Sequence, residues 1–454
     1  GDVLWATAIY SGYTYRQTCM TTISDINNDG YRDVIVGTAG GDRSIIAFSG
    51  KTGQQIWKHD THEYGDGGWV YQVDAAYDYN NDGKPDVLAS TGNDGNNTGP
   101  VRVYCLNGLT GTSIWERPNP AAGPLFSVIG VEDFTGDGKP DVVTGGSNQQ
   151  ESEGGIFGIN GASGQVEWTR PASGTSVWGL MQLDDINGDG KKDVATGDFS
   201  GMMLLLNAAT GSVLHNKNLG YYIILRLEDM GDVNKDGYRD ILVAYSGSQG
   251  IVLSGLDGEY IWTVPLADKA WNVANIGDIS WDGYNDAIIG TLFQSNYGYF
   301  LDGTDGTTMQ IVPASDAVDA LNAIPDIVGD LSMEMVLGAR NGIVTCFSGG
   351  YDSTYIGEPD PALPPENILL TVYPNPFREQ LNIHIELDHQ ASVKMELVDM
   401  TGRFICLIRE GIFSIGKHAI RYDRYAASQE IKPGLFFLKA TIGTQVQWKK
   451  VIAE

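Results

Sequence analysis

The sequence predicts an all-β protein, a seven-bladed β-propeller followed by a small β-sandwich. Three observations support this. A nine-residue acidic motif recurs seven times at intervals of 46 to 55 residues, the 454-residue chain holds 59 glycines, and almost no stretch has a helical period. Many short strands joined by tight turns give such a composition. The length itself predicts more than one domain.

The repeated motif is DINNDGYRD in its first copy, which runs from Asp25 to Asp33. Five further copies keep the spacing of Asp and Gly, and they begin at Asp78, Asp133, Asp185, Asp232 and Asp278. A seventh, DIVGDLSME from Asp326, has Val328 at its third position and Leu331 in place of the Gly.

The rest of each repeat keeps the same phase as the motif. A short apolar run follows it, then a strand and turn such as VYCLNGLTG, then a strand that often ends in Trp, as at Trp57, Trp115, Trp168 and Trp262. A further apolar strand leads into the next motif. Four short strands per repeat of about 50 residues are typical of a propeller blade, and a β-solenoid with the same period is the alternative.

The chain ends predict how the ring closes. VLWAT at the start matches the Trp-bearing strand but has no repeat before it, and GIVTCFSGG ends the seventh repeat without such a strand. We therefore expect Val3 to Thr7 to pair with Ile343 to Phe347 and to complete the seventh blade, because an unpaired edge invites aggregation.

The motif has the oxygen donors that calcium requires. Calcium binds six to eight oxygens from carboxylates, amides, backbone carbonyls and water. Positions 1, 3, 5 and 9 would bind by side chain and position 7 by its backbone carbonyl, while Gly at position 6 permits the sharp turn. The predicted ligands are Asp25, Asn27, Asp29, Tyr31 and Asp33; Asp78, Asn80, Asp82, Lys84 and Asp86; Asp133, Thr135, Asp137, Lys139 and Asp141; Asp185, Asn187, Asp189, Lys191 and Asp193; Asp232, Asn234, Asp236, Tyr238 and Asp240; Asp278, Ser280, Asp282, Tyr284 and Asp286.

Charge supports this interpretation. Six motifs hold 18 carboxylates, three within each nine residues, and such crowding disfavours ionisation unless cations neutralise it. About six calcium ions would bring residues 1–350 from −26 to −14. We expect no metal in the seventh motif and a structural role for the other six. In the alternative, hydrogen bonds of the Asp and Asn side chains shape these hairpins without an ion.

These residues resemble two known repeat families. The Asp motif and the GT or GG strand after it resemble the FG-GAP (or VCBS) repeat of integrin α-chain propellers and their bacterial relatives, whereas LNGLTG followed by Trp is similar to the repeat of quinoprotein-type propellers. No adjacent Cys pair is present, so no quinone cofactor is expected. In integrin-type propellers the calcium hairpins lie on one face and ligands meet the other. The resemblance thus implies that the loops before the innermost strands form the binding face.

Those loops are long and aromatic in the first three repeats, as in HDTHEYGDGGWVYQ. Seven residues before each leading Asp stand Thr18, Tyr71, Phe126, Trp178, Leu225, Trp271 and Asp319. Tyr71, Phe126, Trp178 and Trp271 are the predicted ligand-binding residues, because exposed rings stack on sugars or on apolar side chains. In the alternative, these rings fill the channel and support the loops.

The composition changes after Gly350. Residues 351–366 contain the Pro-rich acidic stretch GEPDPALPPE and are predicted to form a linker. Residues 367–454 alternate like strands and predict an Ig-like β-sandwich. LTVYPNPF, LVDMTGR and PGLFFLKATIG resemble the type A sorting domain of type IX secretion cargo from Bacteroidota. That resemblance implies an extracellular or outer-membrane location and recognition by the secretion machinery. A generic adhesive sandwich domain is the alternative.

The net charge of −28 makes nucleic acid and anionic membranes poor partners. The favoured function is a calcium-stapled propeller that binds a glycan or protein, with no catalytic residues assigned. One alternative is a subunit of an extracellular fibre or surface layer, which would self-assemble. A second is a polysaccharide lyase, although such a site needs clustered cations and a poised base, and the cations here are scattered.

Overall fold

The computed structural model describes residues 4–9, 12–64, 67–92, 99–325, 333–348, 369–387, 390–399, 404–424, 432, 434–442 and 445–453. The chain divides into two compact units, Gly1–Asp352 and Ser353–Glu454, and each has a hydrophobic core of its own. The predicted linker at 351–366 and most of the seventh Asp motif, residues 326–332, lie outside the described residues.

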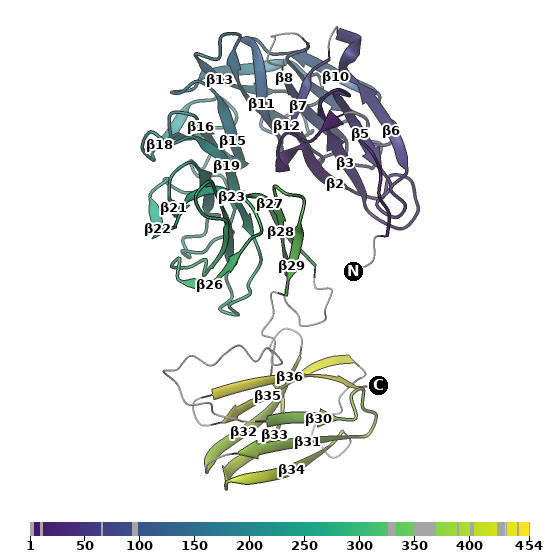
Figure 1. Ribbon diagram of the computed structural model, residues 1–454, viewed down its shortest axis with the longest axis vertical. Coiled ribbons are helices and arrows are strands. Elements are labelled where there is room, and N and C mark those ends of the chain that lie inside the picture. Colours follow the sequence, from purple (N-terminus) through teal and green to yellow (C-terminus); the bar gives the residue numbers. More distant parts are fainter. Residues whose placement is uncertain are drawn as a thin grey trace. The chain divides into compact units, whose positions relative to one another are not determined.

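The first unit consists of successive antiparallel sheets that follow one another in chain order, from β2 in purple to β29 in green (Figure 1). Its described residues form six four-stranded sheets and one three-stranded sheet, and the first strands of neighbouring sheets contact each other. This arrangement is that of a β-propeller and is compatible with seven blades.

The strands occupy equivalent places in each sheet. The first strands are β2 (Met20–Ile23), β7 (Trp69–Asp74), β11 (Ala122–Val131), β15 (Val177–Gln182), β19 (Ile224–Asp229), β23 (Lys269–Asn275) and β27 (Val318–Ile324). The second are β3 (Asp33–Gly37), β8 (Val87–Gly92), β12 (Asp141–Asn148), β16 (Val194–Asp198), β20 (Ile241–Tyr245), β24 (Ala287–Leu292) and β28 (Glu334–Ala339). The third are β5 (Ser44–Phe48), β9 (Arg102–Leu106), β13 (Gly154–Ile159), β17 (Met202–Leu206), β21 (Gln249–Leu253), β25 (Tyr297–Leu301) and β29 (Val344–Phe347). The fourth are β6 (Gln55–Asp60), β10 (Ser113–Pro118), β14 (Val166–Pro171), β18 (Val213–Asn218), β22 (Tyr260–Pro265) and β26 (Thr308–Pro313). A short pair, β1 (Gly12–Tyr13) and β4 (Ala39–Gly40), and two 3-10 turns, η1 (Gln17–Cys19) and η2 (Thr61–Tyr64), complete the unit.

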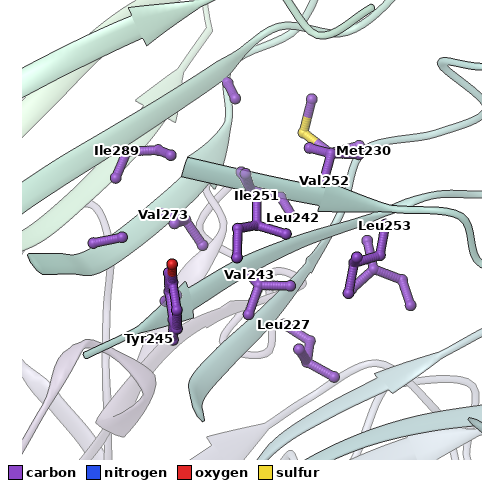
Figure 2. Packing of buried hydrophobic residues seen from close by; sticks show 14 of the residues in the cluster. Leu227, Met230, Leu242, Val243, Tyr245, Ile251, Val252, Leu253, Val273 and Ile289 are labelled. Carbon is purple, nitrogen blue, oxygen red and sulfur yellow. The ribbon is translucent and has the colours of Figure 1, made fainter. Parts of the chain in front are cut away.

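Burial explains why the second and third strands read as continuous apolar runs. Every residue of β5, β8, β16 and β20 is buried, because each sheet is covered on both faces by its neighbours. The fourth strands are more exposed, and polar residues enter them. Figure 2 shows part of the largest core, in which Val243 and Ile251 of one sheet and Val273 of the next belong to the same cluster.

The recurrent Trp joins one blade to the next. Trp57 on β6 donates its indole N–H to the carbonyl of Gly108 at 2.8 Å, in the turn between β9 and β10. Trp115, Trp168 and Trp262 make the same bond to the next blade's turn, at 2.6, 2.7 and 2.7 Å. The ring also covers a turn glycine: a Cβ on Gly111, which has a φ of 70°, would lie 2.5 Å from Trp57. This contact explains why Gly and Trp recur together in the repeats.

The N-terminal segment shows only part of the predicted closure. Trp5 donates to the carbonyl of Gly50 at 2.9 Å, as the repeated Trp residues do, so it occupies the expected phase. Residues 4–9 form no strand, however, and within the described residues β29 pairs only with β28. Among the described residues, 4–7 do not pair with 343–347, and Val3 lies outside the described residues. The seventh sheet meets the first through Gln17, whose side chain bonds both the N–H and the carbonyl of Leu321.

The second unit contains two antiparallel sheets. One has the order β30-β31-β34 and the other β33-β32-β35-β36. The strands are β30 (Leu369–Tyr373), β31 (Gln380–Leu387), β32 (Ala391–Asp399), β33 (Phe404–Phe413), β34 (Gly416–Asp423), β35 (Gly434–Ile442) and β36 (Gln445–Ala453). Buried residues from both sheets, such as Ile383 and Leu438, form its core, which is compatible with the predicted Ig-like sandwich.

Candidate functional site

The six complete Asp motifs adopt one backbone conformation. Each follows the first strand of its sheet and leads into the second. Position 6 is always Gly with φ between 84° and 94°, and a Cβ there would meet nothing, so the conformation rather than space requires Gly. Position 4 also has a positive φ, even where it is Lys235 or Trp281. A bulky residue in this region costs on the order of 1–2 kcal/mol, which shows how strongly the loop geometry is specified.

Carboxylates at positions 1 and 5 hold the turn together. Asp78 accepts the N–H groups of Asn81 and Gly83, at 2.6 and 2.8 Å. Asp82 accepts the N–H of Lys84 and the side-chain amide of Asn107 in the turn after β9. Hydrogen bonds from Gly190 and other backbone N–H groups lower the pKa of the equivalent Asp185. These are the Asx-type hydrogen bonds that the alternative interpretation predicts, in which Asp and Asn side chains shape the hairpins without an ion.

Position 9 has a different environment. All six carboxylates at this position, those of Asp33, Asp86, Asp141, Asp193, Asp240 and Asp286, belong to fully buried residues. Asp86 accepts the N–H of Tyr79 at 2.8 Å and that of Gly108 at 3.0 Å, so it ties its loop to the turn between β9 and β10. Burial raises the pKa of Asp86 and Asp193 to about 6 and that of Asp240 to about 7.

The donor chemistry of the loops fits calcium, although their carboxylates are not gathered around one point. No group of three His, Cys, Asp or Glu side chains in the described residues is placed to hold a metal ion. Yet none of the 18 loop carboxylates forms an ion pair with a described Lys or Arg. Uncompensated charge of this density, partly buried, favours binding of a hard cation through oxygen.

Lysines at position 7 connect successive loops through backbone carbonyls. Lys139 donates to the backbone carbonyl of Tyr79 in the preceding loop at 2.8 Å, and Lys191 donates to that of Asp133 at 2.8 Å. Lys84 makes the same contact with the carbonyl of Asp25. Asn285, at position 8 of the sixth motif, donates to the carbonyl of Met230 just before the fifth motif at 3.1 Å. The Asp loops therefore form a linked row along one end of the first strands.

The other end of the first strands carries an aromatic cluster. It consists of Tyr13, Tyr15, Trp69, Tyr71, Phe126, Trp178 and Phe199, which come from the first four sheets and the segments before them. Tyr15 lies at its centre, with ring centroids 5.8 Å from Trp69, 5.0 Å from Tyr71 and 6.2 Å from Trp178. Tyr13 and Tyr15 are 48% and 40% exposed, so the cluster reaches the surface.

Arg16 lies within this cluster. Its guanidinium carbon is 4.5 Å from the Trp178 ring centroid. Its Nε donates to the carbonyl of Tyr71 at 3.1 Å, and Nη2 donates to Gln72 at 3.2 Å and to the carbonyl of Phe126. These bonds join the first three sheets. Burial lowers the pKa of Arg16 to about 10, and the nearby Arg226 acts in the same direction.

The predicted ligand-binding residues divide into two groups. Tyr71, Phe126 and Trp178 come together, but Tyr71 and Phe126 are only 6% and 4% exposed, which gives them the supporting role of the alternative interpretation. Trp178 is half-buried. Trp271 belongs to a separate pair, 5.6 Å from the exposed Phe293. The exposed ring of Tyr15 contacts Trp178, and that of Tyr13 contacts Trp69.

Sequence reasoning missed Tyr13, Tyr15, Trp69 and Arg16. The prediction took one residue per repeat, the one seven positions before each leading Asp. Tyr13, Tyr15 and Arg16 instead belong to a segment that has no counterpart in the other repeats. Their only sequence signal was the aromatic loop IYSGYTYRQ.

These features define a β-propeller with repeated acidic hairpins and a separate C-terminal β-domain. Residues 25–89 and 78–144 match the family model of the FG-GAP-like repeat, and residues 371–454 match that of the secretion system C-terminal sorting domain. The chain therefore carries FG-GAP-like repeats and a type IX sorting domain, as predicted. The sorting domain indicates secretion to the cell surface or extracellular space of a Bacteroidota-type bacterium, and interaction with the type IX secretion machinery.

Similar solved structures agree on the fold. A chain in the crystal structure of BBS1N in complex with ARL6DN, soaked with mercury, has a TM-score of 0.53 at 11% identity, over 74% of this chain and 93% of that chain. The lead-soaked crystal gives 0.50 at the same identity and coverage. The Neurospora crassa Pan2 WD40 domain has a TM-score of 0.46 at 14% identity, over 73% of this chain and 89% of that chain, and this score is too low to support the fold by itself. Likeness at such identities concerns fold alone.

No curated protein is similar enough to this chain to count as a match. In the described part of the chain, no helix is long and apolar enough to cross a membrane.

Proposed function

We propose that this secreted protein is a calcium-stapled binding propeller, and that its aromatic cluster meets a glycan or protein ligand. The observation that supports binding most directly is the exposure of Tyr13 and Tyr15 above the buried rings of Tyr71 and Phe126. Rings held this way lose little conformational freedom on binding, and aromatic residues with such support are frequent energetic centres of interfaces.

Calcium has a structural role in this proposal. Six ions, one in each complete Asp loop, would be held by the side chains at positions 1, 3, 5 and 9 and by the carbonyl at position 7. The loops and the aromatic cluster lie at opposite ends of the same first strands. Bound calcium would therefore stabilise the blades without taking part in ligand contact.

A binding screen with a matched pair of variants tests the proposal. The calcium-loaded full chain is applied to a glycan array and to surface-protein extracts, alongside Tyr15→Ala and Tyr260→Ala. Both tyrosines are similarly exposed, at 40% and 44%, but Tyr260 lies on β22, away from the cluster. Tyr15→Ala should lose ligand binding, whereas Tyr260→Ala should keep it.

Two outcomes would contradict this. One is a calcium-loaded protein that retains no glycan and no protein. The other is a ligand whose binding Tyr15→Ala leaves unchanged.

A further inference from the structure

Within the described part of this strongly acidic chain, Arg16 is a cation without an anionic partner. The chain carries a net charge of −28, and several of its Arg and Lys side chains pair with carboxylates. Arg226, the neighbouring guanidinium, pairs with Glu228 at 2.5 Å. Arg16 forms no ion pair with any described carboxylate, and its contacts are two backbone carbonyls, one amide oxygen and the face of Trp178.

Further hydrogen-bond donors without an acceptor among the described residues belong to the same aromatic cluster as this guanidinium. The Nη1 group of Arg16 donates to no described residue, since its three hydrogen bonds involve only Nε and Nη2. The indole nitrogens of Trp178 and Trp69 are shielded from solvent and have no acceptor among the described residues. Tyr15 and Tyr71 each contact both indole rings. Buried donors are normally paired, so several unpaired ones in a single cluster mark a place that accepts an oxygen-rich group.

The structure assigns to this cluster a binding site for a single carboxylate, carried by a sugar such as a terminal uronic acid. Arg16 would hold the carboxylate through Nη1, with the N–H groups of Trp178 and Trp69 as further donors, and the exposed rings of Tyr13 and Tyr15 would contact the sugar. This inference rests on the proposed binding function and specifies its ligand.

The charge of the protein favours one carboxylate over many. A polyanion would meet repulsion from the acidic surface, whereas an isolated carboxylate within a low-dielectric cluster gains a strong charge-assisted bond from Arg16. Exposed aromatic faces around the guanidinium suit the C–H surface of a sugar ring. A peptide carboxylate has the same charge but no comparable flat face.

The test compares two sugars that differ only in the carboxylate. An oligosaccharide that ends in glucuronate and its counterpart that ends in glucose are titrated into the calcium-loaded full chain, with calorimetry and tryptophan fluorescence as readouts. The acid should bind at least about tenfold more tightly, as one charge-assisted hydrogen bond provides. Arg16→Gln should remove this preference, and Trp178→Phe, which keeps a ring but lacks the N–H, should weaken it.

Arg117→Gln is the matched control. Arg117 also donates to a carbonyl of the next blade, that of Gly164, but it lies on the outer strand β10, so the sugar preference should stay intact. Melting curves of each variant show whether it remains folded. If Arg16→Gln is unstable, Arg16→Lys retains the charge without the planar donor pair and should show a reduced preference.

The outcomes separate the two proposals. Equal affinity for both sugars, abolished by Tyr15→Ala, would overturn the carboxylate site and leave the binding function intact. Arg16-dependent binding of a peptide carboxylate without binding of the acidic sugar would overturn the assignment to a glycan. Failure of every probe, together with an empty glycan and protein screen, would overturn both.

Discussion

Replacing Asp86 and Asp82 by Ala separates the structural and the metal-binding roles within one Asp loop. Asp86 is fully buried and accepts four hydrogen bonds, from the N–H groups of Tyr79, Asn80 and Gly108 and from the Asn80 side chain. The bonds from Tyr79 and Gly108 are buried, and each stranded donor costs about 1–3 kcal/mol. In the presence of chelator, Asp86→Ala should therefore lower the unfolding free energy of the propeller by about 2–6 kcal/mol.

Asp82→Ala should behave differently. Its two described partners, the Lys84 N–H and the Asn107 amide, are exposed and can bond to water instead. The loss of unfolding free energy in chelator should therefore stay under about 1 kcal/mol. In saturating calcium the variant also lacks one ion. A calcium ion at a free concentration of 100 times its dissociation constant stabilises the folded state by about 2.7 kcal/mol, and Asp82→Ala should lose most of this stabilisation.

Denaturant unfolding followed by tryptophan fluorescence, with calcium and with chelator, measures both effects. Asp82→Ala should lose stability mainly in calcium, and Asp86→Ala in both conditions. Equal losses for the two variants in chelator would refute the buried role of position 9. A loss for Asp82→Ala that calcium does not change would refute its role as a ligand.

Three further predictions follow from the pKa shifts, the chain end and the interblade contacts. Burial raises the pKa of Asp86, Asp193 and Asp240 to between about 6 and 7, above the unfolded value of about 3.9. The folded state thus binds more protons in this range, so the melting temperature in chelator should fall as pH rises from 4 to 7. Calcium should reverse this trend, and a calcium effect as large at pH 5 as at pH 7.5 would contradict the assignment. Deletion of residues 1–8 removes the Trp5 contact with Gly50 and should cause early melting or aggregation; unchanged light scattering and melting would show that the N-terminal segment closes nothing. Trp168→Ala should cost on the order of 3–5 kcal/mol of stability because the ring is buried, whereas half-buried Trp178→Ala should cost less, and calorimetry that ranks them the other way would contradict this.

The repeated parts of the molecule could be predicted from sequence because their physical causes recur. Seven phase-matched motifs located the sheets, and the glycine at position 6 marked a left-handed turn that all six complete loops adopt. The Trp of the outer strands also has one cause throughout, its contact with a glycine in the next turn.

Features that occur once could not be predicted in this way. Arg16 and Tyr15 lie in a loop without repeat partners, and only the folded chain brings them against Trp69 and Trp178. Tyr71 and Phe126 are buried in the same cluster, and a sequence count of ring positions could not distinguish such supporting rings from exposed ones. The double role of position 9, as predicted ligand and as buried acceptor, also needed the turn at Gly108.

The most direct test of the account is the number of calcium ions that the folded chain binds. After calcium-free dialysis and addition of calcium, elemental analysis and calorimetric titration should give about six ions per chain, one for each complete Asp loop. Asp29→Ala should reduce that number by one. Fewer than three bound ions would show that hydrogen bonds alone shape these hairpins, and a full count in Asp29→Ala would show that the first Asp loop does not bind its ion through Asp29.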